Sequence, residues 1–153
     1  MENQQEGVSI EELHKEIDLI QSCITRMAQN SFMVKGWGFT LVAAMAALMA
    51  NKVSPGIICG AGIFILLFFW YLDAFFLMQE KLYRFKYEWV IEERPKGNRK
   101  FLYDLNPWNK EMWKASRKPL HVWQVMISKP CTLLLFYGIP IVIGAVIIIL
   151  SYV

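Results

Sequence analysis

Residues 53–72 read VSPGIICGAGIFILLFFWYL, a run in which no side chain carries a charge. A helix of about 20 residues, each rising about 1.5 Å, is long enough to cross the hydrocarbon layer of a bilayer. A helix buried in a soluble core rarely extends this far without a charge, because one of its faces normally meets water. The run therefore predicts a transmembrane helix.

Two further apolar runs lie on either side of this helix in the sequence. Residues 130–153 are uncharged, and residues 32–50 are uncharged apart from Lys35. Hydrophobic residues make up 56% of the 153-residue chain, more than the about 45–50% of typical soluble domains. The sequence thus predicts an all-α membrane protein with three transmembrane helices.

The order of these runs predicts four segments. Residues 1–30 form a cytoplasmic amphipathic helix, 31–78 a transmembrane hairpin, 79–129 a basic cytoplasmic segment and 130–153 the third transmembrane helix. The hairpin carries long cytoplasmic helical extensions.

Prolines set the expected helix ends. Pro55 suits a first helical turn, and Pro95 belongs to the next strong breaker, so one helix is expected from about Pro55 to about Glu93. No proline separates the N-terminal helix from the first span, so the two should be continuous. Pro140 is expected to kink the third span, because it lacks an amide donor and crowds the preceding turn.

The N-terminal helix carries a start signal and an apolar seam. Ser9 and Glu12 fit a capping box. Apolar residues then recur in alternating steps of three and four, as in a coiled coil, over fewer than three heptads. This seam could face a copy of itself or the extension of another helix, and we expect a homo-oligomer, with a tetramer as one candidate. The seam consists of Ile10, Leu13, Ile17, Ile20, Ile24 and Met27.

The distribution of positive charge predicts the orientation. Of the 16 Lys and Arg residues, twelve lie in residues 79–129, and the short 51–54 turn holds Lys52 alone. Cytoplasmic loops are enriched in Lys and Arg. The N-terminus is therefore expected in the cytoplasm and the C-terminus outside.

Charges within the hairpin occur in register. Lys35 lies 18 positions before Val53 and Asp73 lies 20 after it, so in an antiparallel hairpin they reach a similar depth. Arg26 and Glu80 are both 27 positions from the same centre. Charges within spans are usually paired or functional. The two rungs are candidate charge pairs with a gating role, and the alternative is that each side chain reaches water alone.

The basic segment interleaves cations with aromatic residues, which allows three interpretations. Such a pattern marks a membrane interface, attracts anionic lipid, or binds nucleotides and single-stranded nucleic acid through phosphate contacts and stacking. On the last interpretation, the candidate ligand-binding residues are Arg94, Lys96, Arg99, Lys100, Lys114, Arg117 and Lys118.

Motifs for catalysis do not occur in the sequence. It contains no phosphate-binding loop, dinucleotide fingerprint, HExxH pair or nucleophile elbow. The cysteines and histidines show no metal-ligand spacing. We therefore expect neither an enzyme nor a bound metal or cofactor.

Two stretches resemble a known group of proteins. Residues 24–32 (ITRMAQNSF) with Lys35-Gly36-Trp37, and residues 69–77 (FWYLDAFFL) with 80–84 (EKLYR), resemble small prokaryotic membrane effectors of antiphage defence, and in particular the channel effectors of the Hailong system. The resemblance implies an ion channel held shut by an oligodeoxyadenylate signal, which a partner nucleotidyltransferase makes. It transfers no ligand contact residue by residue. The alternative function is a non-conducting membrane adaptor that recruits a cytoplasmic enzyme through the basic loop.

Overall fold

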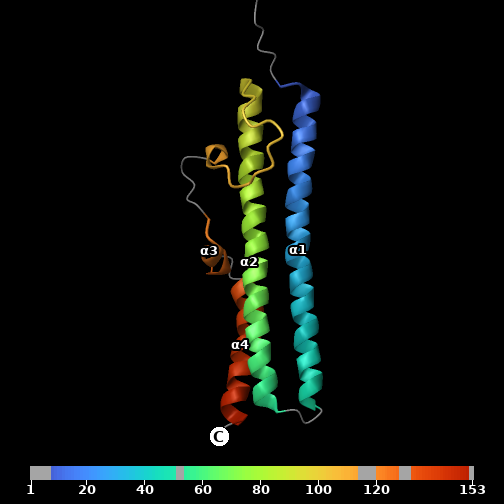
Figure 1. Cartoon of the computed structure of the whole chain (residues 1–153), viewed down its shortest axis with the longest axis vertical. Helices are drawn as coiled ribbons and strands as arrows, with labels where there is room; N and C mark the ends of the chain where they lie inside the picture. Colours follow the sequence, from blue (N-terminus) through green and yellow to red (C-terminus); the bar gives the residue numbers. More distant parts are fainter. Residues whose placement is uncertain (1–7, 51–53, 114–119, 128–131, 152–153) are drawn as a thin grey trace, which may run out of the picture. The chain divides into compact units, whose positions relative to one another are not determined.

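The computed structural model describes residues 8–50, 54–113, 120–127 and 132–151, and within these ranges it is helical without any strand. The helices are α1 (Ile10–Ala50), α2 (Pro55–Glu93), α3 (Val122–Ile127) and α4 (Thr132–Ser151), with 3₁₀ turns η1 (Arg94–Lys96) and η2 (Lys110–Met112) (Figure 1). Of these, α1, α2 and α4 are long and apolar enough to cross a membrane. The chain is an all-α, multi-pass membrane protein, and the predicted fold class is confirmed.

The ends of α1 and α2 follow from their capping residues. The Ser9 amide donates to Glu12 Oε2 at 2.9 Å and the Glu12 amide donates to Ser9 Oγ at 3.1 Å, which confirms the capping box. Helix α1 then runs without interruption into the first span, as predicted. Helix α2 begins at Pro55, where the missing amide donor costs no intrahelical bond.

Helix α2 ends through a glycine turn. After Glu93 the chain tightens into η1, and Gly97 follows with φ 79°, a left-handed conformation that glycine adopts without a Cβ clash. The Gly97 amide donates to the Arg94 carbonyl at 3.0 Å. Because of this turn, the chain from Asn98 onward turns back along α2 within the same structural unit.

The chain forms two compact units. The first comprises Met1–Ala28 and Met78–Leu120, and the second comprises Gln29–Leu77 and His121–Val153. Both α1 and α2 contribute to each unit, while α3 and α4 belong to the second. The three apolar runs of the sequence fall in the second unit, so this unit contains the membrane spans.

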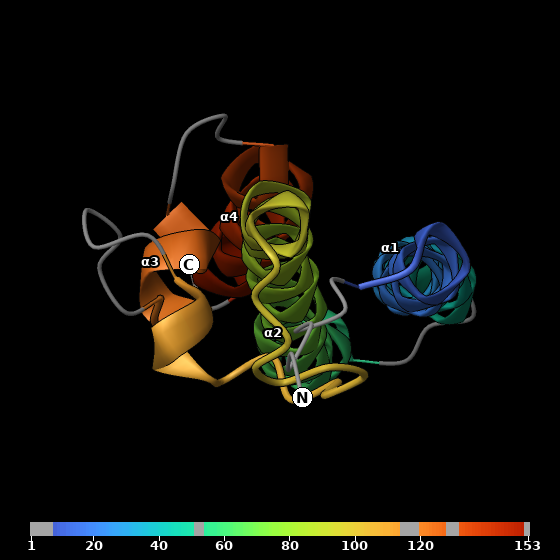
Figure 2. The same ribbon diagram turned by 90° about the horizontal axis from the view of Figure 1, so that it is seen from above.

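Small residues and aromatic rings hold the three spans of the second unit together. Figures 1 and 2 show α4 beside α2. A Cβ on Gly144 of α4 would lie 3.4 Å from Ile63 of α2, a close contact that the glycine makes possible. Phe39 of α1 meets Phe136 of α4 edge to face, with ring centroids 5.0 Å apart. Helix α4 therefore contacts both α1 and α2.

In the first unit, α1 packs its buried face against α2. Ile20 is fully buried, together with Leu82 and Val90 of α2 and Met112 of η2. Ile20 belongs to the predicted oligomer seam, so part of that seam packs within the chain. Ile10, at the other end of the seam, is 74% exposed, and a role of the seam in self-association stays a prediction.

Candidate intramembrane charge cluster

The second unit contains a buried carboxylate, four positions before the unit ends on α2 at Leu77. Asp73, on α2, is 0% exposed, although it lies directly after the uncharged run 53–72. Lys35 of α1 places Nζ 2.7 Å from Asp73 Oδ2 and 2.8 Å from Oδ1. Lys35 and Asp73, which the sequence predicted at a similar depth in the hairpin, are therefore in direct contact. Pairing makes the burial tolerable, because an isolated charge in an apolar site is very costly.

Two hydroxyl groups complete the hydrogen bonding of this carboxylate. Ser31, one helical turn before Lys35, donates to Asp73 Oδ1 and accepts from Lys35 Nζ at 2.8 Å. Tyr137 of α4 donates from its phenol to Asp73 Oδ2 at 3.2 Å. We call Ser31, Lys35, Asp73 and Tyr137 the charge cluster; it joins all three spans.

Aromatic residues enclose the charge cluster on the side of α4. Tyr137 is fully buried, and the Trp70 ring stacks against it with centroids 6.3 Å apart and planes 12° from parallel. Trp70 Nε1 is buried and has no hydrogen-bond partner within the described residues. Lys35 is the accessible member of the cluster, with 27% of its side chain exposed. Lys35 is therefore the member of the charge cluster through which the carboxylate is closest to the surface of the chain.

The predicted second rung of the ladder, Arg26 with Glu80, is wrong. Glu80 Oε1 instead accepts from Arg84 Nε at 2.9 Å and from Nη2 at 2.7 Å, on its own helix. Arg26 donates to Cys23 Sγ at 3.9 Å. A partner four residues away on the same helix costs less conformational entropy than one on another helix, so Glu80 pairs locally.

The first unit contains a second buried ion pair, which the sequence reasoning did not find. Arg94 Nε and Nη2 donate to the two carboxylate oxygens of Glu16, both at 2.7 Å. Arg94 Nη1 donates to the Asn98 carbonyl at 2.6 Å and to the Lys100 carbonyl at 2.9 Å. The side chains are 0% and 1% exposed for Arg94 and Glu16. Every nitrogen of the guanidinium therefore donates a hydrogen bond within the chain. We call the Glu16–Arg94 pair the clamp. The prediction that Arg94 contacts a ligand is corrected, because its side chain is buried and each of these nitrogens already has an acceptor.

The loop after η1 is shaped around this clamp. The Tyr103 amide donates to Glu16 Oε1 at 3.2 Å, and Phe101 and Tyr103 both adopt φ 58°. Residues other than glycine rarely occupy this left-handed region, because Cβ crowds the backbone. The centroid of the Phe101 ring lies 6.3 Å from that of the Trp89 ring. This ring contact and the hydrogen bond from the Tyr103 amide to Glu16 both favour the left-handed conformation.

The other predicted ligand-binding residues differ in their availability. Lys96 pairs with Glu93 at 2.6 Å and Arg99 pairs with Glu12 at 3.0 Å, while Lys100 is exposed. Lys114, Arg117 and Lys118 lie outside the described residues. Two of the predicted anion-binding cations thus already hold carboxylates, which an anionic ligand would have to displace.

These contacts shift the pKa values of groups in the first unit. The Ser9 amide, and then the Arg99 guanidinium, lower the pKa of Glu12 by stabilising its carboxylate. Burial lowers the pKa of Lys86, and Asp104, whose carboxylate lies 3.9 Å away, opposes this shift only partly. Lys86 is therefore a buried cation with weak pairing, unlike Arg94.

Comparison of this chain with protein-family models, with curated proteins and with solved structures finds no significant match.

Proposed function

We propose that the chain assembles into a homo-oligomeric ion channel whose conductance is controlled by an anionic nucleotide or oligonucleotide in the cytoplasm. In this role it depolarises the bacterial inner membrane in antiphage defence. The observation that carries the proposal is the charge cluster: an ion pair with two hydroxyls, buried where three apolar spans meet. Ionisable groups inside spans generally mark ion paths or relays.

The exposure of the spans supports assembly from several copies. Only 11%, 28% and 11% of the most apolar windows of α1, α2 and α4 are buried within the chain. Three helices are too few to enclose a water-filled path, so the path would form between copies. Small residues on α1, such as Ala43 and Ala47, are exposed and would allow close contact between copies.

The resemblance of residues 24–37 and 69–84 to defence effectors supports the cytoplasmic control, and the positive charge of residues 79–129 supports an anionic signal. The same charge asymmetry supports a cytoplasmic N-terminus and an outward C-terminus. A fluorescent protein fused after Val153 should then stay dark, whereas alkaline phosphatase fused there should be active.

Conductance of the purified protein in liposomes tests the proposal. Wild-type protein should dissipate a potassium gradient. Asp73→Asn, which keeps the side-chain shape and removes the charge, should change the conductance. Asp18→Asn makes the same chemical change at an exposed position of α1 and tests whether loss of any carboxylate has the same effect. A wild-type protein that reconstitutes fully but carries no current would favour the adaptor function instead.

A further inference from the structure

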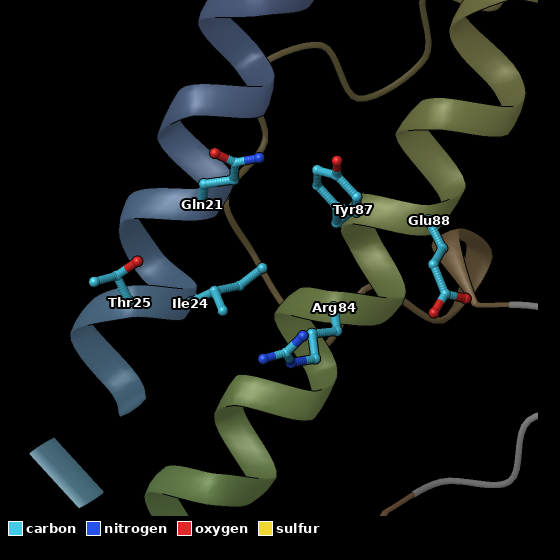
Figure 3. A pocket seen from close by; sticks show the side chains of 6 residues that line it. All are labelled: Gln21, Ile24, Thr25, Arg84, Tyr87 and Glu88. Carbon is cyan, nitrogen blue, oxygen red and sulfur yellow. The ribbon is translucent and has the colours of Figure 1, made fainter. Parts of the chain in front are cut away.

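The first unit contains a groove between α1 and α2. The groove has a volume of about 420 Å³ and is lined by Gln21, Ile24 and Thr25 of α1 and by Arg84, Tyr87 and Glu88 of α2. Figure 3 shows Gln21 and Ile24 extending toward α2, Arg84 and Tyr87 extending toward α1, and Glu88 on the far side of α2. Sites for single small ligands usually measure about 300–1,000 Å³.

The groove is lined by an aromatic ring and by side chains that can donate or accept hydrogen bonds. The Tyr87 ring offers a stacking surface, and the Gln21 carboxamide offers both a donor and an acceptor to one edge of a planar ligand. The hydroxyl groups of Thr25 and Tyr87 can donate or accept, and Ile24 supplies an apolar contact. Stacking with recognition of one polar edge is how proteins bind an unstacked base.

Positive charge is available beside this surface. Glu80 uses Arg84 Nε and Nη2, so Nη1 remains for a ligand, and the Arg84 side chain is 60% exposed. In contrast, Arg94 is buried, and Lys96 and Arg99 hold glutamates.

We infer that this groove binds one nucleotide unit, with the base on Tyr87 and Gln21 and the phosphate on Arg84. The inference rests on the proposed control by a nucleotide signal and places that signal on the extensions of α1 and α2 outside the 31–78 hairpin, rather than on residues 94–118. Because the ligand contacts both α1 and α2, its binding favours whichever state of the channel keeps these helix faces at this spacing.

Fluorescence polarisation on the full-length protein in nanodiscs tests the site. The probes are fluorescein-labelled short single-stranded DNA homopolymers of each base, with unlabelled dextran sulfate as a polyanion that lacks bases. Tyr87→Ala should weaken DNA binding about 5- to 150-fold, the cost of losing one stacked base. Tyr87→Phe should retain most of the affinity, and Gln21→Ala should narrow the differences between bases. Arg84→Gln should make the slope of log affinity against log salt shallower by about 0.7, one phosphate contact.

Tyr103→Ala and Lys100→Ala are the matched controls, because they remove an exposed ring and an exposed cation outside the groove. Normal binding by Tyr87→Ala and Gln21→Ala together with lost binding by Lys100→Ala would place the ligand on the loop and overturn the inference. Equal competition by dextran sulfate would also overturn it, because base recognition would be absent. If the groove variants weaken DNA binding but the wild type carries no current in liposomes, the channel function is rejected and the binding site is retained. If the wild type conducts but the groove variants bind DNA normally, the binding site is rejected and the channel function is retained.

Discussion

The two buried ion pairs of this chain are built in opposite ways. In the first unit, Glu16 faces a planar guanidinium whose three nitrogens all have acceptors, and neither side chain reaches solvent. In the second unit, Asp73 faces a flexible ammonium that stays 27% exposed, and two hydroxyls complete the site. Arginine at a bidentate site is rigid and always charged, whereas lysine is a compact, rotatable point charge.

This difference separates a clamp from a switchable site. Opening the Glu16–Arg94 pair would leave both charges and two backbone carbonyls without partners, so the pair stays closed while the first unit is folded. Lys35 can leave Asp73 by swinging toward solvent, and Ser31 and Tyr137 would still donate to the carboxylate. The Lys35–Asp73 contact can therefore open without leaving the carboxylate with no hydrogen-bond donor.

The largest expected effect comes from breaking the clamp. Arg94→Met leaves Glu16 buried and unpaired, which should lower the free energy of unfolding by about 3–5 kcal/mol. Adding Glu16→Gln should recover a large part of the loss, because no charge then remains buried. Denaturant titration of the detergent-solubilised protein, followed by circular dichroism, gives both values.

Lys86→Met is the matched control, since it makes the same change at another buried cation of the first unit. Among the described residues, Lys86 Nζ has only the Asn106 carbonyl at 3.4 Å and Asp104 at 3.9 Å as partners, so its removal should leave stability unchanged or raise it. Equal losses for Arg94→Met and Lys86→Met would mean that the clamp geometry has no special importance.

A charge exchange in the second unit should have the next largest effect. Asp73→Lys places two ammonium groups together and should prevent normal assembly. Lys35→Asp in the same chain should restore it only in part, because Tyr137 would then meet a lysine instead of an acceptor carboxylate. Size-exclusion chromatography measures assembly. Strictly additive single and double variants would show that the pair does not contribute as a pair.

A smaller effect is expected where α4 meets the charge cluster. Tyr137→Phe keeps the ring against Trp70 and removes the hydrogen bond to Asp73, which should cost about 1.5–3 kcal/mol for a charged acceptor. If the thermal midpoint stays that of the wild type while the conductance changes, the phenol acts on the ion path rather than on stability.

The smallest effect is expected at the exposed pair of Glu12 and Arg99. The lowered pKa of Glu12 means that folding stabilises the ionised form of this side chain relative to the protonated form. This contribution is present above the ordinary pKa of 4.5 and is lost as the pH falls through the lower folded value. The difference in thermal midpoint between wild type and Glu12→Gln should therefore shrink on acidification and in high salt. A difference that grew on acidification would contradict the sign of the shift.

The sequence predicted the features of this fold that depend on local chemistry or on simple register. The capping box needs two residues three positions apart, and the helix ends follow from Pro55 and Pro95. The contact of Lys35 with Asp73 follows from counting outward from the short turn, which places the two residues at a similar depth.

The features that the sequence did not predict depend on long-range or competing contacts. Glu16 and Arg94 are 78 positions apart, and the loop conformation that encloses them uses left-handed aromatic residues that no turn motif predicts. Tyr137 joins the charge cluster from a third helix whose rotation the sequence leaves undetermined. The available signal was that Ser31 and Tyr137 carry hydroxyl groups beside or within apolar runs. The Arg26–Glu80 rung failed because Arg84 offered Glu80 a local partner.

The clamp also has a consequence for biosynthesis. At about 5–20 residues per second, the ribosome needs several seconds to make the 78 positions that separate Glu16 from Arg94. Throughout this interval the N-terminal half of α1 presents Ile20 and a charged Glu16 without their partners. Arg94 can reach Glu16 only after α2 has been inserted and has returned its C-terminal end to the side where α1 began. Closure of the clamp therefore requires that both helices of the hairpin have been made and have come together, and until then Ile20 stays exposed.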